Sequence, residues 1–250
     1  MRELVIDAAA GSAVGNRYRA NFDVVHLARD PLCAVVADGM GDSEGSARAG
    51  RTAVDTFVEW TAAVRRDGPA HERADLSTVE VLRGAVAAAQ QRVGAIGREL
   101  GGLAGCTLTA LTESPEGFWI TQIGDSRVYR LREGLLELLT VDHTMAWLGV
   151  THGWYPFHSH EAAAARYHLT RYIGHTSQPE ADIVPVTVRP GDRYLLCSDG
   201  IADQVSYQEL QHTLSHSAAP AAMVDRLLAA ADAAGGNDNA SAIVVSAGRG

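Results

Sequence analysis

Four aspartates stand at the ends of apolar segments, and each has a glycine within two positions along the chain. They are Asp38, Asp125, Asp199 and Asp238. An ionised carboxylate at a strand end is costly unless it has a partner, and nearby carboxylates raise one another's pKa unless a cation compensates them. Ligand sets made only of oxygen suit hard ions such as Mg²⁺ or Mn²⁺. The shared pattern therefore favours a divalent metal site, although each aspartate alone is also typical of an Asp-Gly turn.

The charged residues exclude several classes of protein. The chain of 250 residues carries a formal charge of −9, which disfavours binding to nucleic acid or to an anionic membrane. All 21 basic residues are arginine, so the chain lacks the lysine that a Walker A loop, a protein kinase or a Schiff-base enzyme needs. Arg127 is the only arginine beside the four aspartate motifs. Divalent cations are therefore the natural compensation for the carboxylates.

The cysteines and the hydrophobic segments bear on the compartment. Cys33, Cys106 and Cys197 are scattered in apolar segments, which predicts buried thiols rather than zinc ligands or disulfides. The first residues, MRELVIDAAAG, are too polar and too few for a signal peptide. No apolar run approaches the ~20 residues of a membrane span. We therefore expect a cytoplasmic protein.

Apolar periodicity predicts the elements that must position the aspartates. Short segments rich in β-branched residues predict strands, and apolar stripes spaced by three and four predict helices. Strands are expected at 4–10, 24–28, 32–37, 106–112, 117–123, 128–132, 135–139, 183–188, 193–197 and 240–246, and helices from 44 to about 66, around 82–100, at 207–215 and at 221–233. A polar linker is expected at 67–77, and an antiparallel meander from the four strands between 106 and 139.

The order of these elements favours one α+β domain over residues 1–250, because strands from both ends of the chain would share sheets. Residues at about 142–181 are irregular, contain six of the ten histidines and predict a loop or flap with a short helix. The aromatic residues of this flap would either pack locally or line a substrate groove. They are Trp147, Trp154, Tyr155 and Phe157.

Six short motifs, taken in their order along the chain, resemble those of the bacterial PP2C (PPM) metal-dependent serine/threonine phosphatases. They are Asp38-Gly-Met-Gly41 with Gly45 and Ala49, Gly105-Cys-Thr, Ile123-Gly-Asp-Ser-Arg-Val-Tyr129, Thr140-Val-Asp-His-Thr144, Leu196-Cys-Ser-Asp-Gly200 and Asp238-Asn239. The resemblance covers the chain from about Gly15 to Val245. It implies a four-layer α/β/β/α sandwich, in which two antiparallel sheets are flanked by helix pairs.

The resemblance also implies a set of metal ligands, namely Asp38, Gly39, Asp125, Asp199 and Asp238. Asp38 would bridge two ions, and the carbonyl group of Gly39 would bind the second. Asp199 and Asp238 would hold the first ion. Asp125, together with Asp199, matches the position of a third, weaker ion. The implied cofactor is therefore Mn²⁺ or Mg²⁺, as two ions with a third at Asp125.

By the same resemblance, the protein is a Mn/Mg-dependent phosphomonoester hydrolase that acts on phosphoserine and phosphothreonine in proteins. Asp38, Asp199 and Asp238 would be its catalytic residues, with Asp23 and Asn239 beside the ligands. A water bridging two cations becomes a hydroxide nucleophile near neutral pH, and it would attack phosphorus in line. We expect a monomer. Two alternatives stay open, namely a phosphatase of small phosphorylated metabolites and a pseudophosphatase that binds a phosphoprotein as a regulator.

The N-terminal segment departs from the family pattern. Phe22 stands where the family has a glutamate or glutamine, and it cannot bind a metal ion. Tyr18 stands where the phosphate-binding arginine belongs, so Arg17 or Arg19 would have to bind phosphate instead. Met40 replaces the histidine general acid of animal members, which leaves protonation of the leaving group to water or to another residue.

Two other readings involve cofactors of different classes. The spacing GxGxxxG over residues 39–45 resembles a dinucleotide-binding loop, but its acidic neighbours would repel a pyrophosphate. His158 and His160 could chelate zinc with His152 or His168, although polar flap residues are the more common explanation.

Overall fold

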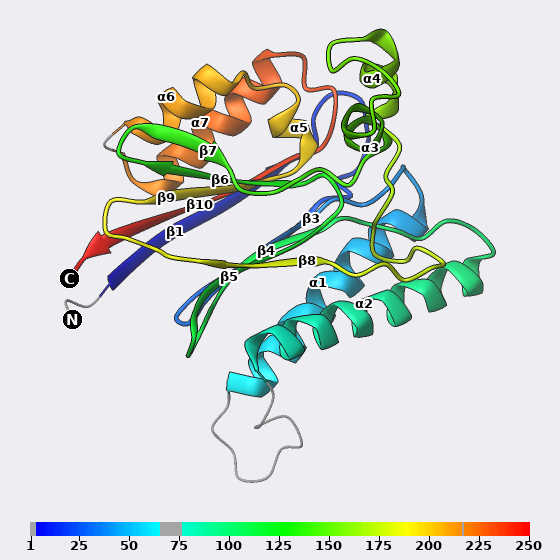
Figure 1. The fold of residues 1–250 in the computed structure, drawn as a ribbon, viewed down its shortest axis with the longest axis horizontal. Coiled ribbons are helices and arrows are strands. Elements are labelled where there is room, and N and C mark those ends of the chain that lie inside the picture. The colour runs from blue at the N-terminus through cyan, green and yellow to red at the C-terminus, as the bar shows by residue number, and fades with distance from the viewer. Residues whose placement is uncertain (1–3, 66–76, 217) are drawn as a thin grey trace.

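The computed structural model describes residues 4–65, 77–216 and 218–250. Two five-stranded antiparallel sheets form its centre (Figure 1). Sheet A has the strand order β1 (Leu4–Ala13), β10 (Ala240–Arg249), β9 (Arg193–Cys197), β6 (Arg127–Arg132) and β7 (Leu135–Leu138). Sheet B has the order β2 (Val24–Arg29), β3 (Leu32–Ala37), β4 (Leu108–Ser114), β5 (Gly117–Ile123) and β8 (Asp182–Val186).

Helices cover the outer face of each sheet. The long helices α1 (Glu44–Arg65) and α2 (Thr78–Leu100) pack on sheet B, and α6 (Tyr207–Ser215) and α7 (Pro220–Ala233) pack on sheet A. Figure 1 shows the resulting layers of helix, sheet, sheet and helix. The order confirms the four-layer sandwich. The expected last residue of the first helix, Arg66, and residues 67–76 of the expected linker lie outside the described residues.

Apolar side chains fill the space between the two sheets. The cluster between the sheets includes Leu32 and Leu111 of sheet B. Tyr194 and Ile243 of sheet A belong to the same cluster, and all four side chains are fully buried. Strands that are buried on both faces read as continuous apolar runs, which is why segments such as β3 were recognisable. The two sheets are therefore held at a fixed separation, and the loops at their ends are held with them.

The first and last strands pair with each other along ten residues, from Leu4 opposite Arg249 to Ala13 opposite Ala240. This pairing confirms that strands from both ends of the chain share a sheet. It also places the segment after β1 beside the segment before β10. Both segments contribute to the cavity described below.

The expected four-stranded meander is wrong. The strands form two hairpins in different sheets, β4 with β5 in sheet B and β6 with β7 in sheet A. The chain crosses between the sheets at Gly124, whose φ is +110°, and a Cβ there would lie 2.6 Å from Thr107. Apolar alternation is the same in both hairpins, so it could not distinguish one sheet from two. The crossing puts Asp125 at the edge of both sheets.

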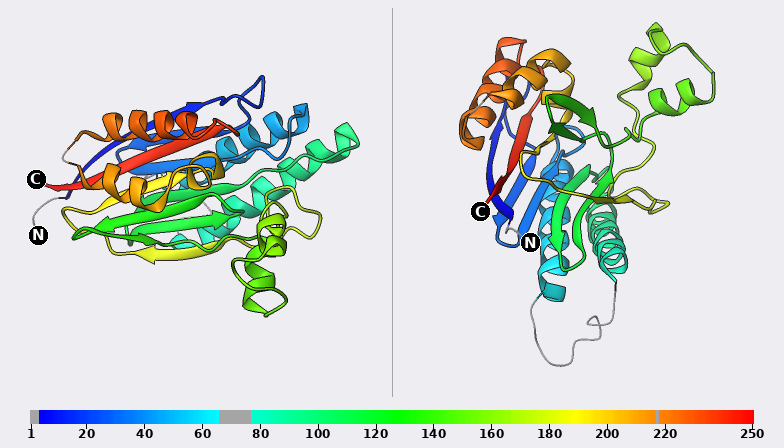
Figure 2. Two further views of the ribbon diagram at one scale, coloured as in Figure 1. Left: turned by 90° about the horizontal axis from the view of Figure 1, so that it is seen from above. Right: turned by 60° about the vertical axis from the view of Figure 1, so that its left-hand side comes forward.

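The flap region contains two short helices rather than the single one expected. They are α3 (Met145–Thr151) and α4 (His160–Ala165), and Thr144 and Ser159 cap their N-termini. Figure 2 shows both helices standing away from the sandwich. The base of this segment is closed by hydrogen bonds from Met145 N–H to the His168 carbonyl and from Thr170 N–H to the His143 carbonyl.

None of the helices in the described residues has the length and apolar character of a membrane span.

Candidate active site

The four predicted aspartates line a single open cavity of about 620 Å³ at one end of the sandwich. Asp38 follows β3, and Asp125 lies in the crossing between β5 and β6. Asp199 begins the short helix α5 (Asp199–Ala202) directly after β9, and Asp238 stands just before β10. Sheet B therefore carries Asp38, sheet A carries Asp199 and Asp238, and the crossing between the sheets carries Asp125. Only the folded sandwich gathers the four side chains.

Thr107 connects the loops that carry Asp38 and Asp125. Its hydroxyl group accepts a hydrogen bond of 2.9 Å from Asp38 N–H, and its own N–H donates to the Asp38 carbonyl at 2.8 Å. The same hydroxyl lies 2.8 Å from that of Ser126. Sequence reasoning gave Thr107 no role. Its place in the Gly105-Cys-Thr motif was the only feature of the sequence that could have indicated this role. Its partners Asp38 and Ser126 are 69 and 19 positions away, and such distant contacts leave no local pattern.

Gly39 allows a close backbone approach beside Asp38. A Cβ at this position would lie 2.8 Å from the carbonyl oxygens of both Phe22 and Ser46. These distances are shorter than van der Waals contact, so any larger residue would push the Asp38 loop out of place. The predicted ligand Gly39 therefore lines the cavity next to Asp38.

The carboxyl groups strongly perturb one another. Burial raises the pKa of Asp38 well above its usual range, and the charges of Asp23, Asp199 and Asp125 add to this effect. Burial likewise raises the pKa of Asp125, together with the charge of Asp199. Burial and Asp238 raise the pKa of Asp199 to about 6. Without compensation, this site therefore favours protons on carboxyl groups that are ionised in water at neutral pH.

The donor set fits hard divalent cations. Asp38 and Asp199 perturb each other's pKa, and such a pair is stabilised by either a proton or a nearby cation. Oδ1 of Asp199 is buried and has no hydrogen-bond partner among the described residues. Side chains that offer only oxygen suit Mg²⁺ or Mn²⁺.

The four carboxylates lie around the cavity without meeting at one point. Within the described chain, no three His, Cys, Asp or Glu side chains form a group close enough to hold an ion as they stand. Negative side chains approach closely only when a cation offsets their charge, so a bound ion would draw these carboxylates together. The fit to metal ions therefore rests on the shared cavity, the effect of the Asp199 charge on the pKa of Asp38 and the unpartnered oxygen of Asp199.

Asn239 anchors the segment that precedes β2. Its side-chain Nδ2 donates to the carbonyl groups of Val14 and Ala20, at 2.6 and 3.1 Å, and its Oδ1 accepts from Phe22 N–H at 2.7 Å. Asn239 N–H also donates to Oδ1 of Asp238 at 2.8 Å. A single side chain thus fixes the segment 14–22 against the strand end that carries Asp238.

Arg17 and Tyr18 of this segment line the cavity; both Arg17 and Arg19 are exposed, but Arg19 is absent from the cavity lining. The guanidinium group of Arg17 lies over the Tyr18 ring, 5.1 Å from its centroid, and the Phe22 ring meets Tyr18 edge-on at 6.1 Å. The aromatic pair therefore supports Arg17 at the mouth of the cavity. Of the two candidate phosphate-binding arginines, only Arg17 has this position.

His143, a residue that sequence reasoning left without a role, holds the crossing that carries Asp125. Gly124 N–H donates to Nδ1 of His143 at 3.1 Å, and His143 N–H donates to the Gly124 carbonyl at 2.9 Å. Since Nδ1 accepts, the proton belongs on Nε2, which donates to Asp182 at 3.1 Å. Burial lowers the pKa of His143, so the ring is neutral and the arrangement is fixed.

The remaining cation and cofactor readings find little support. Arg127 does not face the four aspartates, because its guanidinium group binds both carboxylate oxygens of Asp142. The described histidines of the flap belong to no group of three metal-binding side chains. Gly39 and Gly41 of the glycine-rich loop border the same acidic cavity, which would repel a pyrophosphate.

The aromatic residues of the flap divide into two groups. Tyr155 packs against Gly149, while the other three flap aromatics are exposed.

The sequence matches the family described as Protein phosphatase 2C over residues 17–241. The chain belongs to the protein phosphatase 2C family. The matched range includes Arg17 and all four aspartates of the cavity. The resemblance drawn from the six motifs is therefore confirmed, and so is the family's sandwich fold.

Known members of the protein phosphatase 2C family are similar to almost the whole chain. The serine/threonine protein phosphatase PstP of Mycobacterium tuberculosis is 33% identical over 242 residues, which cover 96% of this chain. The match covers 45% of PstP, so the chain spans a little less than half the length of this relative.

Two solved structures have the same architecture. The PPM Ser-Thr phosphatase MsPP from Mycobacterium smegmatis, in complex with cacodylate, superimposes with a TM-score of 0.82 at 30% identity, covering 97% of this chain and 98% of MsPP. The catalytic domain of PstP in complex with two manganese ions gives a TM-score of 0.79 at 30% identity, covering 98% of this chain and 100% of that one.

Proposed function

We propose that this protein is a Mn²⁺- or Mg²⁺-dependent phosphatase that removes phosphate from phosphoserine and phosphothreonine in proteins. The observation that carries the proposal is the convergence of Asp38, Asp125, Asp199 and Asp238 on one cavity, where the charge of Asp199 raises the pKa of Asp38. Membership of the protein phosphatase 2C family supports the same chemistry. So does the manganese content of the PstP catalytic domain.

We assign the metal sites from the family resemblance, and the shared cavity supports the assignment. Asp38 would bridge two ions, Asp199 and Asp238 would hold the first, and the Gly39 carbonyl group would hold the second. Asp125 would contribute to a third position with Asp199. When bound, the ions would lower the pKa of a water molecule for in-line attack and offset the charge on the phosphoryl oxygens.

The remaining residues of the cavity would bind and orient the substrate. The Arg17 guanidinium group, supported by the Tyr18 ring, would grip the phosphoryl oxygens with charge-assisted hydrogen bonds. Burial and Asp238 raise the pKa of Tyr18, so its phenol stays protonated and could donate a further hydrogen bond. Phe22 offers only its backbone to the site, so the second ion would have fewer ligands than in members with a glutamate there.

Three further assignments belong to this proposal. Residues 1–250 would act as one phosphatase domain with a flap at about 142–181, which is supported by the pairing of β1 with β10. The substrate would be a phosphorylated protein, with no role for nucleic acid or a membrane, and the protein would be a monomer. The net charge of −9 disfavours nucleic acid and anionic membranes as partners, and the buried free thiols favour a cytoplasmic location.

The test is turnover of p-nitrophenyl phosphate with Mn²⁺, with and without EDTA, beside a phosphoserine peptide and a panel of sugar phosphates. We expect hydrolysis of p-nitrophenyl phosphate and of the peptide, and loss of both activities in EDTA. Activity that survives chelation would remove the metal mechanism. Turnover confined to sugar phosphates would instead indicate a metabolite phosphatase. Bound metal without any turnover would favour the phosphoprotein-binding regulator, which the substitution at Phe22 also favours.

A further inference from the structure

A groove leads away from the aspartate cavity along helix α2. It consists of a hollow of about 500 Å³ beside Arg98 and a smaller one of about 160 Å³ beside Arg83, which share Gln90 and Gln178 in their walls. We refer to the two hollows together as the α2 groove. Its opposite wall is the segment 172–183, which runs down from the flap beside α2 (Figure 1).

The α2 groove is continuous with the cavity. Leu103, whose surface is 54% exposed, lines both of them. Met40 of the cavity and Tyr172 of the groove approach the same point, since a Cβ at Gly105 would lie 3.0 Å from each of them. A polypeptide with its phosphate in the cavity could therefore extend over Leu103 into the groove.

The two walls of the groove are fixed to each other. Gln90 of α2 is almost fully buried, and its Nε2 donates to the carbonyl groups of Tyr172 and Pro179 at 3.0 and 3.2 Å. Its Oε1 accepts from Gly174 N–H at 2.7 Å. Because all of these contacts join α2 to the segment 172–183, the groove is part of the folded structure.

One stripe of α2 forms the near wall, at spacings of three and four residues. Its members are Arg83, Val86, Ala87, Gln90, Gly94, Gly97 and Arg98, and the C-cap residue Gly101 continues the wall. Packing explains Gly84 of the same helix, where a Cβ would meet Trp60 at 2.5 Å, and Gly97, where it would meet the Gly102 carbonyl at 3.1 Å. At Gly94, a Cβ would meet only the end of the Arg98 side chain, at 3.5 Å. Gly94 therefore leaves room in the groove.

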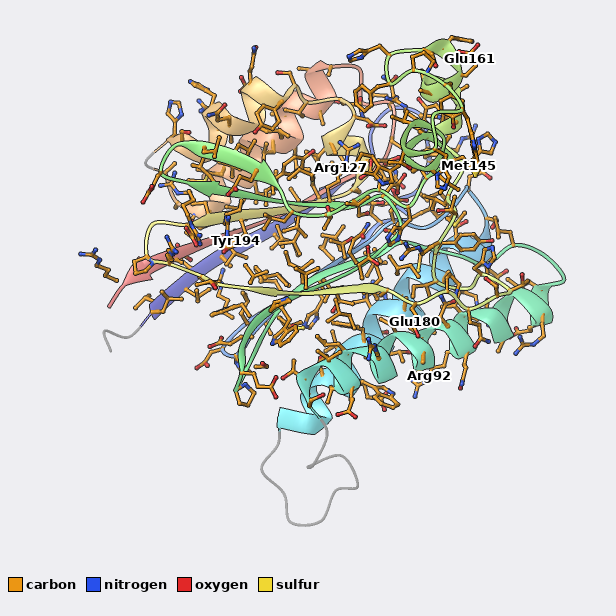
Figure 3. All side chains as sticks on the ribbon, viewed as in Figure 1. Arg92, Arg127, Met145, Glu161, Glu180 and Tyr194 are labelled. Atoms are coloured by element: carbon orange, nitrogen blue, oxygen red, sulfur yellow. The ribbon has the colours of Figure 1, made fainter. Side chains whose placement is uncertain are left out.

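The charge of the groove contrasts with that of the cavity. Of the described residues that line the larger hollow, none is acidic, and Arg98 and His175 are its basic members. The smaller hollow adds Arg83 and Glu180, and Figure 3 shows Glu180 on the segment beside α2. An acidic peptide would therefore be attracted to Arg98, and a metal-filled cavity would not repel it.

We propose that the α2 groove binds the polypeptide on one side of the phosphorylated residue and prefers acidic side chains near Arg98. The inference rests on the phosphatase function proposed above. From Arg98 to Arg83 the helix rises about 22 Å, which an extended peptide covers with about seven residues. The substrate class is thus a phosphoprotein segment with acidic residues on one flank of the phosphorylated residue.

The test compares phosphoserine peptides that extend about seven residues to the N-terminal or to the C-terminal side, each in a glutamate-rich and a glutamine-rich version. For one direction of extension, we expect the wild type to prefer the glutamate version about threefold or more in kcat/KM. Arg98→Glu should abolish or reverse that preference. Gly94→Leu should lower kcat/KM for both versions of that peptide about fivefold or more, while raising Tm, because leucine favours the helix.

Two controls separate the groove from the active site. Arg226→Glu makes the same change of charge on the exposed face of α7, on the other side of the sandwich, and should leave every rate unchanged. Turnover of p-nitrophenyl phosphate should be the same in all variants. The inference is overturned if Arg98→Glu and Gly94→Leu leave all peptides unaffected, or if they lower p-nitrophenyl phosphate turnover equally. A wild type without metal-dependent turnover would instead refute the proposed function, and the groove inference with it.

Discussion

The hydroxyl group of Ser198 donates a hydrogen bond of 2.8 Å to Asp23, across 175 positions of the chain. The same hydroxyl accepts from Ser241 N–H at 3.0 Å. Ser198 directly precedes Asp199, and Asp23 directly follows Phe22. The contact therefore joins the N-terminal segment of the site to the strand end that supplies one of its central carboxylates.

The first prediction concerns the pH dependence of stability without metal. Burial raises the pKa of Asp23 to about 7, although the hydrogen bond from Ser198 lowers it. The folded protein thus binds a proton that the unfolded chain releases near pH 4, so the contribution of this group is lost as pH rises from about 4 to about 7. In EDTA, the Tm of the wild type should fall over that range. This fall should be smaller in Asp23→Asn. Over the same pH range, the loss of unfolding free energy should be less than in the wild type by an amount on the order of a few kcal/mol. Equal slopes would contradict the prediction.

The second prediction concerns Asp38→Asn and Asp199→Asn. Each substitution removes a proposed metal ligand and should lower turnover by more than about a hundredfold, since even residues that only support ligands cost up to that factor. Each also removes a buried charge from a repulsive pair, so Tm in EDTA should be equal to or higher than that of the wild type. Thermal unfolding with and without Mn²⁺ should show that the stabilisation by metal is lost. Near-normal turnover in both variants would overturn the metal assignments.

The third prediction treats His143 as a positioning residue. His143→Ala leaves the buried Gly124 N–H without its acceptor and should cost about 1–3 kcal/mol of stability. The looser Asp125 loop should require about 10–100-fold more Mn²⁺ for half-maximal activity. Excess Mn²⁺ should restore most of kcat, a response that general destabilisation would not give. His152→Ala, on the exposed flap, is the matched control and should leave the Mn²⁺ dependence unchanged.

The fourth prediction separates the two candidate phosphate-binding arginines. Arg17→Ala removes the guanidinium group at the cavity mouth and should raise KM for p-nitrophenyl phosphate about tenfold or more, with a parallel loss of inhibition by inorganic phosphate. Arg19→Ala removes an exposed arginine from outside the cavity lining and should change KM by less than about twofold. The assignment fails if the two variants behave alike, or if Arg19→Ala has the larger effect.

Much of the fold was predictable, because buried strands and amphipathic helices carry strong apolar patterns. The segment 32–37, for example, is apolar throughout and is buried along its whole length. The division of strands between sheets was not predictable. The crossing at Gly124 depends on a close approach to Thr107, and one hairpin sequence resembles another.

The aspartates of the site were recognisable from a repeated local context, a carboxylate beside glycine at a strand end. The residues that hold them in place were not. Thr107 and His143 act through backbone groups of distant loops, and such contacts leave no periodic signal in the chain. The choice between Arg17 and Arg19 also needed coordinates, because the direction of neighbouring side chains depends on how Asn239 fixes the segment.

The position of β10 has a consequence for biosynthesis. This strand lies between β1 and β9, and Asp238 stands two positions before its first residue, Ala240. During translation, the ribosome therefore makes Asp238, the last of the four aspartates, together with β10, the strand that pairs with β1. Both follow all the other elements of the sandwich. Until then β1 has an unpaired edge, which chaperones would have to protect from aggregation. The cavity therefore receives its last aspartate only when the final strand of the described sandwich is made.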